Sequence, residues 1–123
     1  MADDLLVSVI DDDESVRESI PDLLRTFGFH VRAFNSAEAF LASDVIEVTR
    51  CVVLDVAMPG MSGPELFEQL KRRPKALPVI FITAQRNGDI CQHLVAQGAA
   101  ACLHKPFDPM ALVEAVKHVV PHN

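Results

Sequence analysis

The sequence lacks tryptophan and tyrosine altogether, and phenylalanine supplies all seven of its aromatic residues. This scarcity disfavours a flavin-binding protein, because few aromatic side chains are there to line a flavin pocket. The three cysteines are odd in number and show no CxxC spacing. That pattern argues against a disulfide framework and against a zinc knuckle, and it fits a reducing cytosol.

Long apolar runs are also missing, since none approaches the roughly 18 residues of a membrane span. The chain starts MADD, with acids where a secretory signal carries bases. Basic residues are few: 11 lysines and arginines face 17 aspartates and glutamates, which gives a formal net charge of −6. A duplex-binding surface needs the opposite balance. We therefore expect a soluble, cytoplasmic protein without membrane contact or direct nucleic-acid contact.

Five segments have the composition of β-strands. Segments 5–10, 51–57 and 77–84 are nearly continuous in apolar character, which is typical of strands covered on both faces of a parallel sheet. Segment 30–34 alternates apolar and polar residues, as a half-exposed edge strand does. The five segments are LLVSVI (5–10), HVRAF (30–34), CVVLDVA (51–57), LPVIFITA (77–84) and the weaker AAACLH (99–104).

Apolar residues recur at helical spacing between these segments. Ser36 can cap the second helix, and Pro64 fits the first turn of the third. Pro21 lies inside the first helix, where it costs on the order of 3 kcal/mol, so we expect a kink or a helix that starts late. The helical regions are 16–27 before Gly28, the turns after Ser36 and Ser62, about 89–97 before Gly98, and a last helix from about residue 108.

Strand and helix therefore alternate five times along the chain. This pattern predicts right-handed crossovers and an α/β fold, with a doubly wound parallel sheet and helices on both faces. A chain of 123 residues is long enough for one domain and too short for two of ordinary size. We expect a single domain over residues 1–123.

Polar side chains follow four of the five strand segments: Asp11 and Asp12, then Asp55, Thr83 and Lys105. Ligands of an open parallel sheet bind beyond the carboxyl ends of its strands. Two unit charges 4 Å apart interact by about 4 kcal/mol at an effective dielectric near 20, so three gathered carboxylates need a cation. Mg²⁺ prefers carboxylate oxygens. The sequence therefore predicts a Mg²⁺ (or Mn²⁺) site formed by Asp11, Asp12 and Asp55.

Four stretches, in this order, resemble the signatures of response-regulator receiver domains: VIDDDESVRES, LDVAMPGMSG, FITA and HKPF. Lys105 follows Thr83 by 22 residues, which matches the family's spacing. The segments VRESI, SAEAFL and MPGMSGPEL are most similar to receivers of the FixJ type, which commonly precede a helix-turn-helix DNA-binding domain. The resemblance implies a flavodoxin-like (βα)5 fold with strand order 2-1-3-4-5.

The resemblance also implies roles for the acidic residues. The family's phosphoacceptor falls on Asp55, where a carboxylate can attack phosphorus. Asp12 is the implied direct metal ligand and Asp11 the ligand through water, while the third contact is the backbone carbonyl of Ala57. Asp13 and Glu14 lie past the strand end, at the start of a helix, where the helix dipole favours acidic side chains. We therefore expect both residues to lie outside the site.

Further roles fall on the other side of the site. The resemblance implies that Lys105 pairs with the phosphoacceptor and that a cis peptide precedes Pro106. Thr83 would turn its hydroxyl onto a phosphoryl oxygen, and the small Ala84 would admit a bulky phosphodonor. Cys102 stands where most receivers carry an aromatic residue that swings inward. We therefore expect output through repacking of the fourth helix, without an aromatic switch.

These residues favour a two-component phosphorelay receiver that takes a phosphoryl group from a sensor histidine kinase. It would catalyse only its own phosphorylation and dephosphorylation, and so is not a metabolic enzyme. It would control an effector domain or protein, with DNA binding and transcription as the implied output. Relatives also imply a homodimer through the fourth helix, fifth strand and fifth helix. The chain is either a stand-alone receiver or the N-terminal part of a longer regulator.

Two other functions stay open as alternatives. One is a phosphorylation-independent interaction module on the same fold, although the full set of polar residues at the strand ends argues against it. The other is an aspartate-nucleophile phosphatase, which needs a second aspartate two residues after the nucleophile. This chain has Ala57 there, and it is too short to include a substrate domain.

Overall fold

The computed structural model describes residues 6–84 and 88–120, and within them five parallel strands form one sheet. Its order, β2-β1-β3-β4-β5, confirms the predicted α/β fold with flavodoxin-like topology. β2 lies at an edge and is partly exposed, whereas β1, β3 and β4 are buried along their whole length. The strands are β1 Leu6–Ile10, β2 His30–Phe34, β3 Cys51–Asp55, β4 Val79–Thr83 and β5 Ala101–His104.

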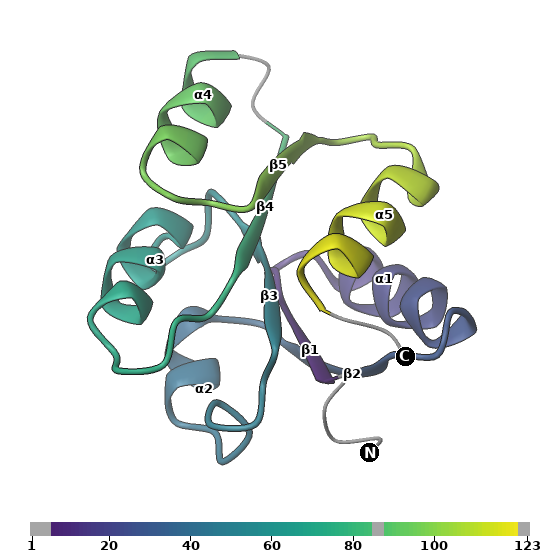
Figure 1. Cartoon of the computed structure of the whole chain (residues 1–123), viewed down its shortest axis with the longest axis horizontal. Coiled ribbons are helices and arrows are strands. Elements are labelled where there is room, and N and C mark those ends of the chain that lie inside the picture. The colour runs from purple at the N-terminus through teal and green to yellow at the C-terminus, as the bar shows by residue number, and fades with distance from the viewer. Residues whose placement is uncertain (1–5, 85–87, 121–123) are drawn as a thin grey trace.

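Helices cover both faces of the sheet. Three of them, α2 to α4, lie on one face, and α1 and α5 lie on the other (Figure 1). Each strand is joined to the next through a helix, as the predicted crossovers require. The helices are α1 Glu14–Thr26, α2 Ala37–Leu41, α3 Gly63–Lys71, α4 Gly88–Ala96 and α5 Pro109–Val119.

The core consists of two apolar layers, one on each side of the sheet. The layer under α2 to α4 includes two edge-to-face aromatic pairs, Phe34 with Phe40 and Phe67 with Phe81. The layer under α1 and α5 is mostly aliphatic, with Leu24 fully buried among valines and isoleucines. Because strand side chains alternate between faces, each buried strand contributes to both layers.

Side chains at the helix N-termini fix where the helices begin. Ser36 accepts a hydrogen bond from Ala39 N, as predicted. Ser62 and Glu65 form a capping box, in which each side chain accepts from the other's backbone N–H. Asp108 caps α5 through Met110 N. These caps set the first turns of three helices and so the lengths of the loops that precede them.

The expected late start of the first helix is wrong. α1 begins at Glu14 and continues through Pro21 to Thr26 as one helix. Pro21 is buried with Ile20 and Leu24 on the face that packs inward. Tertiary packing of this apolar face outweighs the hydrogen bond that proline cannot donate.

The expectation that the cysteines form no disulfide is also wrong. Cys91 of α4 and Cys102 of β5 are joined by an S–S bond of 2.04 Å, with their Cα atoms 5.4 Å apart. The chain turns at Gly98, whose φ is +113°, and this turn brings β5 back alongside α4. The pairing depends on that turn, so neither the number nor the spacing of the cysteines reveals it.

No helix in the part of the chain that the structure describes is long and apolar enough to cross a membrane.

A buried pair of hydroxyl groups links β1 to the segment before β3. Ser8 Oγ lies 2.8 Å from Thr49 Oγ1, and Thr49 donates to Val45 O at 2.8 Å, which leaves Ser8 as the donor. Thr49→Val should therefore lower the free energy of unfolding by about 1–3 kcal/mol, because the Ser8 hydroxyl loses its acceptor. Adding Ser8→Ala should recover part of that loss in urea denaturation. Strictly additive losses would contradict this account.

Candidate functional site

The carboxyl ends of four strands meet at one edge of the sheet. Ile10 lies beside Leu54, Asp55 beside Ile82, and Thr83 beside His104. The polar residues predicted from the strand ends are therefore neighbours in space. They are Asp11 and Asp12 after β1, Asp55 at the end of β3, Thr83 at the end of β4 and Lys105 after β5.

Backbone and side-chain contacts fix Asp11 in place. Its backbone N–H donates to Phe34 O of β2 at 3.1 Å, and its Oδ1 accepts from Asp13 N at 2.9 Å. Arg17 reaches back from α1 and donates to Asp11 O at 3.0 Å. Asp11 is fully buried. The sequence did not identify Arg17, because its contact with Asp11 depends on how the start of α1 lies relative to the end of β1.

Asp13 lies outside the acidic site, as expected. It is the N-cap of α1, and its carboxylate accepts hydrogen bonds from both the backbone N–H and the hydroxyl of Ser15. The Ser15 hydroxyl bond, followed by the backbone bond, lowers the pKa of this exposed carboxyl. Asp13 therefore stays ionised as a helix cap.

The backbone around Asp55 folds back tightly. Val56 N donates to Ile82 O, and Gly63 N donates to Val56 O, each at 3.0 Å. A Cβ on Gly63 would overlap the carbonyl oxygen of Asp55 and lie 3.0 Å from Val56 Cα. Glycine is thus required where α3 starts against the end of β3. The sequence shows Gly63 only as a residue that opens a helix, so this close approach was missed.

The loop between β3 and α3 is tied to α2. Glu38 Oε2 accepts a hydrogen bond from Met61 N at 3.0 Å. Ala57 lies in this loop and is exposed. Its backbone carbonyl stays a predicted metal ligand. Glu38 was not identified from the sequence, because it acts across 23 residues of chain.

Three carboxylates converge at the edge. One carboxylate oxygen from each of Asp11, Asp12 and Asp55 lies within 4.8 Å of the other two. Asp11 is fully buried and Asp55 is 5% exposed, while Asp12 is open to solvent. Oxygen ligands at this separation, with one exposed side, suit a hard divalent ion that keeps part of its water shell. The donor set therefore fits Mg²⁺ or Mn²⁺.

Lys105 supplies a positive charge to the same group. Its Nζ lies 2.8 Å from Asp11 Oδ2 and 3.6 Å from Asp55 Oδ1. Lys105 N donates to Thr83 O at 2.8 Å, and a cis peptide joins Lys105 to Pro106, as the resemblance implied. Burial alone would lower the lysine pKa, but the hydrogen bond and charges of the two carboxylates outweigh it and raise the pKa. The ammonium stays charged.

The electrostatic environment makes Asp55 unusually basic. Burial and the negative charge of Asp11 raise its pKa from 3.8 to about 6, against the opposing effect of Lys105. At neutral pH Asp55 is mostly ionised and has one oxygen near the Lys105 ammonium. A buried, ionised carboxylate of raised basicity is a competent nucleophile.

The remaining predicted residues lie around this group. Thr83 is buried at the end of β4, next to the exposed Ala84. Pro106 is exposed after the cis peptide. Cys102 is half-buried, packs against the layer under α2 to α4 and is bonded to Cys91. The position at which the resemblance implied an aromatic side chain in relatives is therefore covalently tied to α4.

Comparison with known proteins agrees with this geometry. Residues 7–117 match the response regulator receiver domain family. The chain is 42% identical over 117 residues to the transcriptional regulatory protein FixJ of Azorhizobium caulinodans, covering 95% of this chain and 56% of that protein. Among the curated relatives it matches, the chain spans about half the length of the first three.

Solved structures give the same result. The response regulator StyR is 41% identical, with a TM-score of 0.82, over 94% of this chain and 58% of that one. The BeF3-activated DrrB receiver domain is 28% identical, with a TM-score of 0.85, over 96% of this chain and 98% of that one.

The raised pKa of Asp55 predicts a specific stability change. In the presence of EDTA, Asp55→Asn should raise the free energy of unfolding at pH 8 by about 2–3 kcal/mol. Each unit of raised pKa corresponds to about 1.4 kcal/mol, and the rise from 3.8 to about 6 already includes the attraction of Lys105. The folded protein binds the Asp55 proton more tightly than the unfolded chain. The gain should therefore be absent below pH 3.8, grow with rising pH, and be complete above about pH 6.

Urea denaturation between pH 4 and 8 measures this gain. Asp13→Asn is the matched control, since the pKa of that exposed carboxyl is lowered instead. This variant should lose a small amount of stability that is almost the same across pH 4–8, because the Asp13 carboxyl titrates below pH 3.8. A gain for Asp55→Asn that does not depend on pH would contradict the assignment.

Proposed function

The chain belongs to the response regulator receiver family, and on that premise we propose that Asp55 accepts a phosphoryl group from a phosphohistidine. A receiver domain is a signalling component and not a classical enzyme. The observation that carries the proposal is the placement of Asp55 beside both the Asp11–Asp12 pair and the Lys105 ammonium. This arrangement supplies a nucleophile together with positive charge for an incoming phosphoryl group.

The proposed transfer is a displacement at phosphorus. An Asp55 carboxylate oxygen attacks the phosphorus atom as the P–N bond to the donor histidine breaks, and the imidazole leaves with the bonding electrons. Lys105 Nζ, already 3.6 Å from Asp55 Oδ1, can bind a phosphoryl oxygen and offset the added negative charge. Positioning and electrostatic stabilisation supply most of the rate enhancement for a reaction of this kind.

The acidic group would hold the metal. Asp12 and Asp55 would coordinate Mg²⁺ (or Mn²⁺) directly, Asp11 through water, and Ala57 through its backbone carbonyl. The bound ion would offset charge on the phosphoryl oxygens during transfer. The carboxylates themselves keep this edge of the sheet polar and exclude apolar ligands.

Phosphorylation would be transmitted through β4. The Thr83 hydroxyl, at the strand end next to Lys105, can donate to a phosphoryl oxygen and so bring the following segment toward the site. Ala84 is exposed and small, which leaves room for the donor side chain. Residues 85–87, which connect this point to α4, lie outside the described part of the chain. We place the output at α4, β5 and α5.

The partners follow from the family. The phosphodonor would be a sensor histidine kinase, and the effector a domain or protein that controls transcription, since FixJ is named a transcriptional regulatory protein. Residues 1–123 would form one receiver domain, either alone or as the N-terminal part of a longer regulator. A homodimer through α4, β5 and α5 is part of this proposal. Because the kinase draws its phosphate from ATP, we place the reaction in the cytoplasm.

The test is phosphorylation by a small donor. Incubation with Mg²⁺ and acetyl phosphate should add the mass of one phosphoryl group to the wild type, and Asp55→Asn should abolish the addition because it removes the nucleophile. Intact-mass spectrometry measures both. Asp13→Asn is the matched control and should accept the group normally. Unmodified wild type, or full modification of Asp55→Asn, would refute the proposal and favour an interaction module that does not depend on phosphorylation.

Metal binding is tested separately from phosphorylation. Mg²⁺ should raise the free energy of unfolding of the wild type by about 1.4 kcal/mol when its concentration is ten times its Kd. Asp12→Asn should remove most of this increase, because the variant loses a direct ligand. Urea denaturation with and without EDTA measures the difference. An equal Mg²⁺ effect on wild type and Asp12→Asn would place the ion elsewhere.

A further inference from the structure

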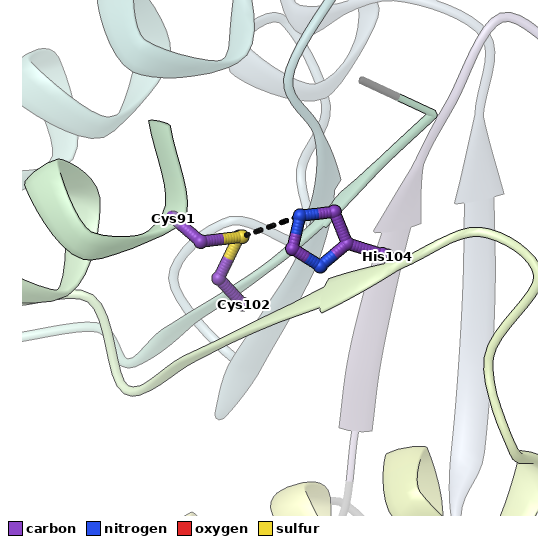
Figure 2. The surroundings of a disulfide bond; sticks show 3 residues. All are labelled: Cys91, Cys102 and His104. Carbon is purple, nitrogen blue, oxygen red and sulfur yellow. Dashed lines mark hydrogen bonds between the residues drawn. A yellow bond between two sulfur atoms is a disulfide. The ribbon is translucent and has the colours of Figure 1, made fainter. Parts of the chain in front are cut away.

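The disulfide joins the two elements that flank one turn. Cys91 lies on α4 and Cys102 on β5 (Figure 2), and both residues are half-buried. The bond closes a segment of chain with a sequence separation of 11. A disulfide in this place restricts how far α4 can move from the sheet.

An imidazole contacts one of the two sulfurs. His104 Nε2 lies 3.8 Å from Cys91 Sγ, and Figure 2 shows the ring directed at that atom. A disulfide sulfur carries no hydrogen, so the ring N–H is the donor and the sulfur the acceptor. His104 is exposed, at the end of the same strand that carries Cys102. A proton donor is therefore in place beside the sulfur of Cys91.

The third cysteine, Cys51, differs from this pair in its burial and in the pKa of its thiol. Cys51 is fully buried in β3, in the layer under α1 and α5. Burial raises the pKa of its thiol to about 12, so it does not form the nucleophilic thiolate at neutral pH. Any exchange chemistry in this chain is thus restricted to Cys91 and Cys102.

We infer that Cys91, Cys102 and His104 form a thiol–disulfide exchange site that takes low-molecular-weight thiols and disulfides such as glutathione, and that its redox state sets how tightly α4 is held to β5. The site is separate from the acidic group, and the inference does not depend on phosphorylation of Asp55.

Reduction proceeds in two balanced steps. A thiolate attacks Cys102 Sγ and forms a mixed disulfide, while the S–S bond breaks and Cys91 Sγ leaves with the electron pair. The ring N–H of His104 donates a hydrogen bond to that sulfur, which takes its proton from solvent. A second thiolate then attacks the mixed disulfide, which releases the small disulfide and leaves Cys102 as a thiolate that takes a proton from solvent. Two thiols are oxidised to one disulfide, and the protein disulfide is reduced to two thiols.

The direction of attack follows from the hydrogen bond. Exchange is faster when the leaving sulfur is the better leaving group. His104 stabilises negative charge on Cys91 Sγ, so Cys91 leaves and Cys102 is attacked. In the reverse reaction the same imidazole stabilises the thiolate of Cys91, which then closes onto a mixed disulfide at Cys102.

The packing of α4 makes it sensitive to this bond. Among residues 89–96, whose side chains are described, Leu94 is buried and Ile90 and Cys91 are half-buried, while the others are exposed. Leu94, Ile90 and the disulfide are therefore the buried and half-buried contacts of this stretch of α4. Reduction removes the covalent cross-link and leaves only the noncovalent contacts of the helix.

Thiol trapping in glutathione buffers tests the chemistry. The native protein, equilibrated over a range of reduced-to-oxidised glutathione ratios and alkylated, should interconvert between no accessible thiols and two, as measured by intact mass. Cys51→Ala should behave like the wild type. Cys91→Ser should form a stable mixed disulfide with glutathione at Cys102. A protein that keeps two accessible thiols in fully oxidised glutathione would overturn the inference.

The role of His104 is tested by rate. A partner that lowers a thiol pKa by one unit raises the thiolate fraction about tenfold and lowers its nucleophilicity about threefold, which leaves a net gain of about threefold. His104→Gln should therefore slow both ring closure and reduction by about threefold, with the equilibrium ratio of dithiol to disulfide unchanged. Unchanged rates would remove His104 from the site.

Hydrogen exchange tests the consequence for α4. Amides of residues 88–96 should exchange about tenfold or more faster in the dithiol form than in the disulfide form, while β1 and β3 should stay unchanged. Oxidised and reduced wild type have the same sequence, so failure of a variant to fold cannot produce this difference. Equal exchange rates in α4 would overturn the proposed control of that helix.

Discussion

The structure depends on holding two buried carboxylates close together and offsetting their repulsion with a positive charge. Asp11 and Asp55 are both buried at the carboxyl edge of the sheet, where two unit charges 4 Å apart repel by about 4 kcal/mol at an effective dielectric near 20. The Lys105 ammonium, 2.8 Å from one carboxylate and 3.6 Å from the other, supplies part of the compensation. The parallel sheet is what makes this possible, because it delivers the ends of β1, β3 and β5 to one edge. The residual excess of negative charge is the physical basis for the proposed divalent-ion site.

Most of the fold could be predicted because the local signals agree. Continuous apolar runs marked the buried strands, and alternation marked β2 as an edge. Ser36 and Ser62 marked two helix starts. The differences are at boundaries, where α4 runs Gly88–Ala96 against an expected 89–97. The late start expected from Pro21 is wrong because the cost of a missing hydrogen bond is local, whereas the packing of α1 against the sheet involves distant residues. Local sequence patterns therefore predict the strands and helices well, but they do not predict how the packing between these elements stabilises them.

The candidate site was predictable to the same extent. Asp11, Asp12, Asp55, Thr83 and Lys105 each follow a strand, so a topological rule was enough to gather them. Arg17, Glu38 and Gly63 obey no such rule, since each acts through a contact made by the folded loops. The disulfide belongs to this second class. Its two cysteines meet because the chain reverses at Gly98, and although the sequence predicts a helix end there, no cysteine spacing motif shows which cysteines this turn brings together.

Strand β5 is the element common to both chemistries. Cys102 on β5 is bonded to α4, and three residues later Lys105 contacts Asp11 and Asp55. A free thiol at this position is too small to contact a partner as an aromatic ring does. The disulfide, however, couples β5 to α4 more directly than a noncovalent contact of a thiol or a ring. If α4 must move when a phosphoryl group occupies the acidic edge, the bond opposes that movement, and breaking it permits the movement. Under the proposed function, the position of Cys102 would then be a point where redox chemistry limits the response to phosphorylation.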